Sequence, residues 1–320
     1  RLLLELVACL AGCRLSLVAG ALVMGMVQSL VNSIAFPRPP RGFSEAELLR
    51  RPDLVWLRTS TSKTVPAIYR KHATSAPRFT LVYSHGNAED VGLSLSYIDF
   101  FADLLNVDVL AYEYLGYSVA DGEPSESGLY ESIEAAWDYL STHCGVQPES
   151  IVLFGRSLGS APTIHLASRR PRVGGMVLQS PLASGVRVVG SVASSIILKP
   201  CDPFQNYAKI HRVKCRTVVM HGREDCVVPF WHGLSLHEAL AKRQLAFEPF
   251  WPPGCGHNDM PENLCVAHIL EFLRSLPPLP PTPSGVTPPG LALGLHPSKN
   301  VSYDASLTMT NRIDRGELLS

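Results

Sequence analysis

The sequence predicts an α/β fold in which a mostly parallel central sheet is covered by helices on both faces. Short apolar runs alternate with helical patterns along the middle of the 320-residue chain. The composition, 46% hydrophobic and 18% charged residues, supplies enough apolar surface for a large core and excludes a chain disordered throughout. The apolar runs are also short, as is typical of parallel strands buried on both faces.

Eight segments are predicted to be strands. The first two, 54–59 and 65–70, are expected to form an opening pair. Five short apolar runs are expected to be buried parallel strands: 79–84, 108–114, 151–154, 176–180 and 217–221. Residues 246–251 are predicted to form the last strand.

Helical patterns lie between these runs. Leu129, Ile133, Trp137 and Leu140 recur at spacings of four, four and three and so form one apolar stripe. Further helices are expected directly after Ser157, near 232–241 and over 262–275. With no internal repeat in the sequence, we expect one folded α/β domain over residues 42–276.

Two segments stand outside this alternation. Residues from about 182 to 214 are predicted to form a short lid-like insertion or acyl groove, with a buried core helix as the alternative. Eight prolines fall within 277–297, and we expect the tail 277–320 to be disordered.

Charge and cysteine content exclude several classes of function. Lys plus Arg equals Asp plus Glu, 28 each, so no basic field exists and nucleic acid is not an expected partner. The eight cysteines include no C-x-x-C pair, which disfavours structural zinc, and we predict neither a metal nor a cofactor. Cys215 with Cys226 and Cys255 with Cys265 are possible pairs, but buried free thiols are favoured.

Residues 1–41 are predicted to associate with a membrane. Residues 15–36 are 22 positions without a charge, which is long enough for a bilayer span. Polar residues such as Gln28 and Asn32 weaken this apolarity, so a tilted or interfacial helix is the alternative. We expect a membrane-associated protein whose folded domain faces the cytoplasm, although the arginines flanking the segment leave its orientation undecided.

Two cysteines precede the uncharged segment. Cys9 and Cys13 are candidates for S-palmitoylation, or else small apolar residues on a helix face. The run 10–13 is similar to a lipoprotein cleavage box, but Glu5 interrupts the preceding apolar run and no polar linker follows. Because the sequence opens with Arg1 rather than Met, we expect further residues upstream.

The stretch 151–161 carries the strongest chemical signal. It combines a strand, a G-x-S-x-G motif and a helix rich in small residues, which places Ser157 on a sharp turn between strand and helix. Such a turn strains the serine backbone by about 1–3 kcal/mol, and Gly155 and Gly159 relieve crowding on either side. Ser157 is therefore predicted to be a nucleophile, with a helix-capping serine as the alternative.

A serine hydroxyl needs a base, and the base needs an orienting carboxylate. The chain order expected for this turn is serine, acid, histidine. Asp225 follows the strand 217–221 and is the predicted acid, with Glu224 as its rival. His257 lies in a loop after the last predicted strand and before the terminal helix, and is the predicted base.

An oxyanion site is the third requirement of this chemistry. The segment 83–87 follows a strand and forms a tight loop, so the backbone N–H groups of Asn87 and Leu158 are the predicted donors. Loss of one such donor costs about 3 kcal/mol of activation free energy. The alternative for this segment is a plain turn.

Together these motifs resemble the α/β-hydrolase superfamily and, within it, the abhydrolase domain 17 family of membrane-bound protein depalmitoylases. The carrying stretches are SHGNAEDVG (84–92), AYEYLGY (111–117), GEPSE (122–126), LYESIEAAW (129–137), FGRSLGS (154–160), SPLASGVRV (180–188), HGRED (221–225) and GHND (256–259). The resemblance implies an α/β-hydrolase fold and a catalytic triad of Ser157, Asp225 and His257.

The sequence departs from the family pattern at three places. Ser118 and Ala120 stand where the family usually has a glycine and a serine, and Arg156 replaces a usual glutamine. The N-terminal segment has two cysteines where the family has a dense cluster. None of these departures touches the predicted triad.

The expected function is that of a serine hydrolase that removes palmitoyl groups from S-acylated cysteines. Its expected partners are S-acylated membrane proteins or acyl lipids, and a membrane surface bound through residues 1–41. A membrane-associated esterase acting on monoacylglycerol or lysophospholipid is the alternative, because a triad cleaves oxygen esters and thioesters alike. A non-catalytic binding protein of the same fold is the remaining class.

Overall fold

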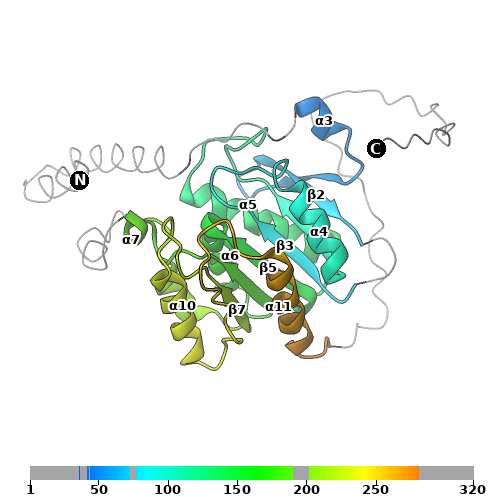
Figure 1. Ribbon diagram of the computed structural model, residues 1–320. Coiled ribbons are helices and arrows are strands. Elements are labelled where there is room, and N and C mark those ends of the chain that lie inside the picture. The colour runs from blue at the N-terminus through cyan, green and yellow to red at the C-terminus, as the bar shows by residue number, and fades with distance from the viewer. Residues whose placement is uncertain (1–35, 37–41, 43, 73–76, 190–201, 281–320) are drawn as a thin grey trace, which may run out of the picture.

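The computed structural model describes Phe36, Gly42 and residues 44–72, 77–189 and 202–280 (Figure 1). Its central feature is a seven-stranded sheet with the order β1-β2-β4-β3-β5-β6-β7. The strands are β1 Leu54–Arg58, β2 Thr64–Arg70, β3 Thr80–Ser84, β4 Asp108–Tyr112, β5 Ile151–Arg156, β6 Gly175–Gln179 and β7 Thr217–Met220. The pairs β1–β2 and β2–β4 are antiparallel and the other four are parallel. The predicted mostly parallel sheet and its opening pair of strands are confirmed, and the structure shows that this pair is antiparallel.

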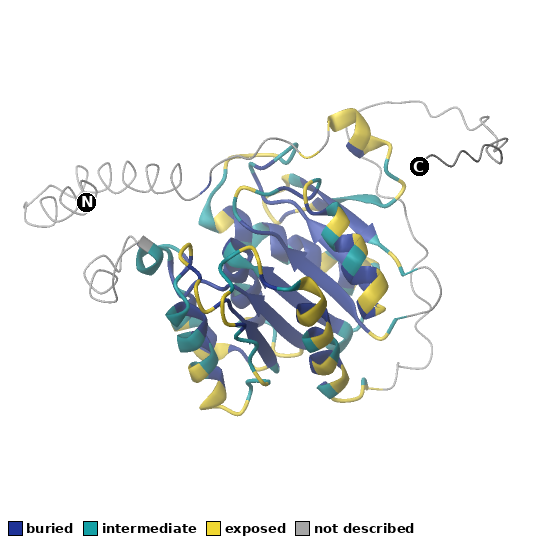
Figure 2. Cartoon of the chain, in the orientation of Figure 1, coloured by how far each residue is buried: buried dark blue, intermediate teal, exposed yellow. Residues whose placement is uncertain are grey.

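Helices cover both faces of this sheet. One face carries α4 (Leu95–Leu105) and α11 (Glu262–Ser275), and the other carries α5 (Glu126–Asp138), α6 (Ser160–Ala167) and α10 (Trp231–Ala241). Side chains alternate along β5, so Val152 and Phe154 pack under the first pair and Leu153 under the second group. Figure 2 shows the buried strands between helices whose outer surfaces are exposed. The core therefore has two layers, one on each side of the sheet.

Short helices and caps complete the described chain. The short helices are α3 (Glu45–Leu49), α7 (Gly185–Val189) and α9 (Asn206–Lys209). Ser125 begins α5 because its hydroxyl accepts the Gly128 N–H at 3.0 Å, an N-cap bond. The helix predicted to run to Leu140 ends at Asp138 and continues as a π-helical turn over Tyr139–His143.

The predicted last strand, 246–251, does not form a regular strand. It touches β7 at two isolated parallel bridges, Thr217–Ala246 and Met220–Phe250. The N–H groups of Phe247 and Phe250 bond to successive acceptors on β7, the carbonyls of Thr217 and Val219, so one extra residue intervenes. Pro249 has no N–H to donate and stands where a regular ladder needs one, so the chain bulges and pairing is broken.

Several predictions concern residues outside the described ranges. These are the membrane segment 1–41 (apart from Phe36), Cys9, Cys13, the tail from 281 and the centre of the lid-like insertion, 190–201. Phe36 is buried, and its ring meets that of Phe204 edge-on with centroids 5.7 Å apart. None of the helices in the described ranges has the length and apolarity of a bilayer span.

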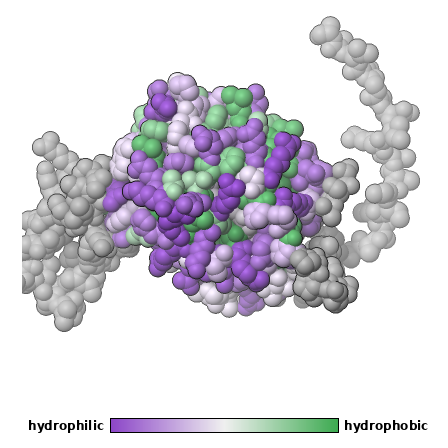
Figure 3. Space-filling model, turned by 90° about the horizontal axis from the view of Figure 1, so that it is seen from below, coloured by the Kyte–Doolittle hydropathy of each residue, from purple (hydrophilic) through white to green (hydrophobic). Residues whose placement is uncertain are grey.

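The described cysteines are free thiols, so neither of the two possible disulfide pairs forms. Large exposed hydrophobic side chains are scattered over different elements: Leu49, Leu93, Leu104, Val227 and Leu264. Hydrophilic residues predominate on the face shown in Figure 3, where hydrophobic residues occur in small groups.

Candidate active site

Ser157 lies at the junction of β5 and α6 in a strained backbone conformation. Its φ is +50°, in the left-handed region that non-glycine residues rarely adopt. A Cβ on Gly155 would lie 2.6 Å from the Gly159 carbonyl oxygen, and one on Gly159 would lie 2.1 Å from that of Ser84. Both positions need glycine because the turn packs directly against itself and against the end of β3. The turn thus lifts the Ser157 side chain above the edge of the sheet.

The three residues that the sequence selects lie in one hydrogen-bonded chain. His257 Nε2 is 3.0 Å from Ser157 Oγ, and His257 Nδ1 is 2.7 Å from Asp225 Oδ2. A carboxylate only accepts hydrogen bonds, so Nδ1 carries the proton and Nε2 is left to accept the Ser157 O–H. The rival acid, Glu224, is exposed, and its own hydrogen bond runs from its backbone N–H to the Cys255 carbonyl.

Asp225 is held as a buried carboxylate by several donors. Its Oδ1 accepts the N–H groups of Val227 and Val228 at 2.9 and 2.8 Å, and its side chain has no exposed surface. Burial by itself would raise the pKa of Asp225, but the hydrogen bonds from His221 and His257 outweigh burial and hold it well below the ordinary value for aspartate. The group facing His257 is therefore charged at neutral pH.

His221 is a neighbour of this carboxylate to which sequence reasoning gave no role. Its Nε2 lies 2.8 Å from the Val228 carbonyl and 3.1 Å from Asp225 Oδ2, and its ring is fully buried. Its Nδ1 has no hydrogen-bond partner among the described residues, so the proton belongs on Nε2, where both acceptors lie. The only sequence signal was its place at the end of β7 in the HGRED stretch.

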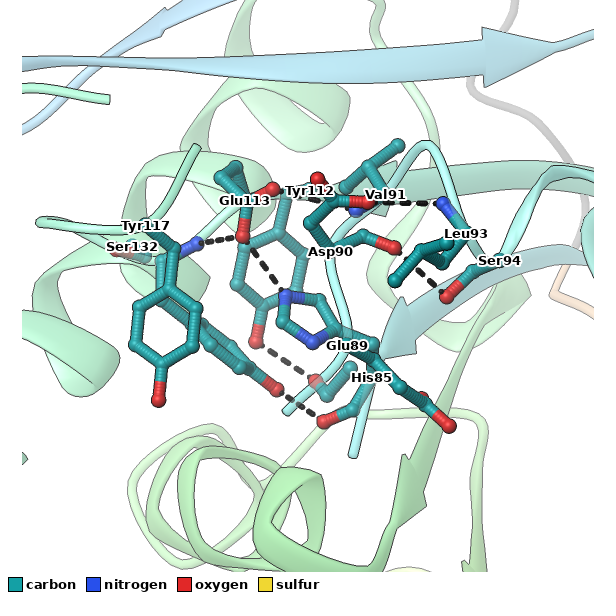
Figure 4. Close-up of polar contacts among 12 residues, drawn as sticks. His85, Glu89, Asp90, Val91, Leu93, Ser94, Tyr112, Glu113, Tyr117 and Ser132 are labelled. Atoms are coloured by element: carbon teal, nitrogen blue, oxygen red, sulfur yellow. Dashed lines mark hydrogen bonds and ion pairs between the residues drawn. The ribbon is translucent and has the colours of Figure 1, made fainter. Parts of the chain in front are cut away.

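The loop after β3 is held by a buried pair of side chains, His85 and Glu113 (Figure 4). His85 Nδ1 lies 2.9 Å from the Gly86 carbonyl, and His85 Nε2 lies 2.9 Å from Glu113 Oε1. With Glu113 ionised both partners are acceptors, so both ring nitrogens donate and the ring is an imidazolium. Burial opposes this charge, but the charge of Glu113 and its hydrogen bond raise the pKa of His85 overall.

This support orients the peptide that precedes Asn87. In a trans peptide the C=O and N–H groups point in opposite directions. Because the Gly86 carbonyl points at His85, the Asn87 N–H points away from the buried ring. β3 and β5 are neighbours, with Ser84 opposite Gly155, so the loop that carries Asn87 lies beside the turn that carries Leu158. The two predicted oxyanion donors thus come from adjacent strand ends.

A cleft of about 460 Å³ adjoins these loops, a volume within the usual range for small-molecule sites. Its walls combine apolar and polar side chains: Tyr83, Leu93, Tyr97, Phe100 and Met260, with Glu89, Ser94, Ser96, Arg156, Gln179, Asn258 and Glu262. Arg156 and Asn258 are the chain neighbours of Ser157 and His257. Among the described residues, no group of three or more His, Cys, Asp or Glu is arranged to hold a metal ion.

Fold and site define the protein as an α/β hydrolase. The profile of the prolyl oligopeptidase family, itself built on this fold, matches residues 196–275. Among solved structures, an esterase of Pyrococcus furiosus superimposes with a TM-score of 0.58 at 15% identity, covering 75% of this chain and 98% of the esterase. An esterase of a Rhodococcus species superimposes with a TM-score of 0.54 at 16% identity, covering 70% and 100%. At these identities the likeness concerns the fold alone.

The chain belongs to the alpha/beta hydrolase domain-containing protein 17 family. It is 36% identical to human protein 17B over 203 residues, which is 63% of this chain and 68% of that protein. It is 39% identical to mouse protein 17C over 222 residues, 69% of this chain and 66% of that protein. It is also 43% identical to the alpha/beta hydrolase domain-containing protein aho-3 of Caenorhabditis elegans over 197 residues, 62% of this chain and 57% of that protein. The match thus spans 57–68% of the length of these three relatives.

Proposed function

We propose that this protein is a serine hydrolase that removes palmitoyl groups from S-acylated cysteines of membrane proteins. The observation that carries the proposal is the unbroken hydrogen-bonded chain from Ser157 through His257 to Asp225. A serine, a histidine in the accepting tautomer and a buried carboxylate are the three parts of nucleophilic acyl transfer. The strained turn places the side chain of Ser157 above the sheet, where it can attack an acyl carbonyl.

The first half of the reaction forms an acyl-enzyme. Ser157 Oγ attacks the acyl carbonyl carbon while His257 Nε2 takes the hydroxyl proton. The N–H groups of Asn87 and Leu158 stabilise the negative charge that develops on the carbonyl oxygen. The carbon–sulfur bond then breaks, and the proton on His257 passes to the departing cysteine sulfur. Asp225 stabilises the imidazolium throughout and does not itself take the proton.

Water completes the second half of the reaction. His257 takes a proton from a water molecule, whose oxygen attacks the acyl carbonyl, and returns that proton to Ser157 Oγ. The products are a free fatty acid and a free cysteine thiol, and the enzyme returns to its starting state. No electron leaves or enters the cycle, so the residues of this chain and one water molecule are sufficient.

Three features support an acylated membrane protein as the substrate. The motifs that resemble the depalmitoylases include all three proposed catalytic residues. Residues 1–41 are proposed to bind the membrane surface, with acylation of Cys9 and Cys13 as a possible second anchor and the hydrolase domain on the cytoplasmic side. Phe36, at the end of the uncharged segment, packs on Phe204 within the predicted lid-like insertion.

A matched pair of substrates tests this proposal. The full chain in detergent is incubated with an S-palmitoylated peptide and with the same peptide in which serine replaces the acylated cysteine. We expect cleavage of the thioester, and loss of at least 10³-fold in kcat for Ser157→Ala. Cleavage of the oxygen ester alone would instead favour a membrane lipid esterase. If neither peptide is cleaved, the depalmitoylase proposal is wrong.

A further inference from the structure

Arg156 connects two loops of the candidate site across the turn that carries Ser157. It stands between Gly155 and Ser157, and its side chain is about four-fifths buried. One terminal nitrogen, Nη1, pairs with Glu89 Oε1. The other, Nη2, donates to Asn258 Oδ1 at 2.8 Å. The planar guanidinium fixes the two partners at a defined separation, which a lysine ammonium could not do.

Each partner holds one catalytic loop. Glu89 uses its second oxygen, Oε2, to accept the Gly86 N–H at 2.9 Å, so the ion pair continues into the backbone of the loop after β3. Gly86 directly precedes Asn87, whose backbone N–H is the proposed oxyanion donor. On the other side, Asn258 is the residue next to His257, the proposed base.

We propose that Arg156 is a positioning residue that ties the oxyanion loop to the histidine loop and so fixes the distance from Asn87 to His257. This inference rests on the proposed function. The tie links positions far apart in the sequence, since Glu89 lies 67 residues before Arg156 and Asn258 lies 102 residues after it. Rate depends steeply on this geometry, since a displacement of about 1 Å can cost 10²-fold. Arg156 does not touch the reacting atoms and acts through its two partners.

The test compares a variant that removes the centre of the tie, Arg156, with a variant that weakens its Glu89 end. Arg156→Met keeps the length of the side chain and removes both donors, and Glu89→Gln keeps the shape and removes the charge. With a chromogenic butyrate ester as substrate, we expect kcat to fall about 10- to 100-fold in each variant while KM changes less than twofold. The kcat of the double variant should be no lower than that of the poorer single variant, because the Arg156–Glu89 pair is lost in all three variants. Arg156→Lys should restore only part of kcat.

A second measurement is independent of catalysis. Hydrogen exchange of the amides in 86–91 and 254–260 should be at least tenfold faster in Arg156→Met than in the wild type. The control is Arg70→Met, whose guanidinium also contacts two carboxylates, Asp99 and Asp103, but on the outer side of α4. In this control variant, both kcat and the exchange rates of these loops should stay within twofold of the wild-type values.

Four results decide the proposal. Unchanged exchange in both loops, or additive losses of kcat in the double variant, would overturn the tie. A rise in KM with unchanged kcat would also overturn the proposal, since that result would make Arg156 a substrate contact. If the wild type cleaves no ester but exchange rises in Arg156→Met, the proposed function fails and the tie stands.

Discussion

Asp225 accepts more hydrogen bonds than any other side chain of the proposed triad. Two backbone N–H groups bind one oxygen, and two histidine rings approach the other. These donors keep its pKa below the ordinary value despite burial. The structure around Asp225 is thus arranged for a permanent negative charge, and the same arrangement links protein stability to pH.

Acidification should reveal the stabilisation that comes from Asp225. Its pKa is lower in the folded chain than the value of about 3.9 in the unfolded chain, so the unfolded chain binds more protons in this range. The stabilisation is complete above about pH 4 and is lost as pH falls through the folded pKa. We expect the difference in unfolding free energy between wild type and Asp225→Asn to shrink between pH 6 and pH 3. Urea unfolding at several pH values measures this, and a difference that stays constant would contradict the account.

At the scale of elements, the loop after β3 depends on groups beneath it rather than on its own sequence. The imidazolium of His85 binds the Gly86 carbonyl and is neutralised by Glu113, which directly follows β4. Glu113 also accepts the Val91 N–H at 3.2 Å and the Tyr114 N–H at 3.0 Å. One buried carboxylate therefore ties the β4 end to both ends of the oxyanion loop.

Removal of this carboxylate's charge should destabilise the whole domain. In Glu113→Gln the His85 imidazolium loses its counter-charge in the core, and such losses cost about 3–5 kcal/mol. The double variant His85→Gln/Glu113→Gln should recover part of this loss, because no buried charge remains. Glu149→Gln is the control, since its partner Arg172 is exposed, and it should stay within about 0.5 kcal/mol. Chemical denaturation measures all three, and a Glu113→Gln value as small as the control's would refute the ion pair.

Sequence periodicity predicted seven strands of the sheet because buried parallel strands are short apolar runs. The prediction was wrong at 246–251, where Pro249 interrupts the backbone hydrogen bonds to β7. The apolar composition of this segment does not show that interruption. Sequence periodicity also assigned no helix to 95–105, although the buried Ile98, Phe101 and Leu105 of α4 show helical spacing. Alternation along the chain thus identified the fold, but it missed the break at Pro249 and the helix α4.

The same contrast holds for the site. Ser157 and Asp225 stand in recognisable motifs after β5 and β7, and His257 stands in a recognisable loop motif, so their sequence neighbours sufficed to select them. The partners that hold them, such as His221 and Glu113, are ordinary residues whose roles arise from tertiary contacts. Arg156 stood out only as a departure from the family pattern, and its connection to Glu89 and Asn258 needed the folded chain.

For the whole molecule, the catalytic loops gather at one edge of the sheet and the proposed membrane segment joins the domain through Phe36. The Phe36 ring packs on Phe204, whose own N–H donates to Glu126 at the start of α5. Phe36 is thus linked through Phe204 to the first residue of α5.

The central claim is that Ser157 is a nucleophile activated by His257 and Asp225. The most direct measurement treats the full chain with a serine-reactive fluorophosphonate and maps the adduct by mass spectrometry. We predict a single adduct on Ser157, with labelling slowed at least 10³-fold in His257→Gln. An adduct on another serine with Ser157 unmodified, or labelling of Ser157 that is equally fast in His257→Gln, would contradict the account.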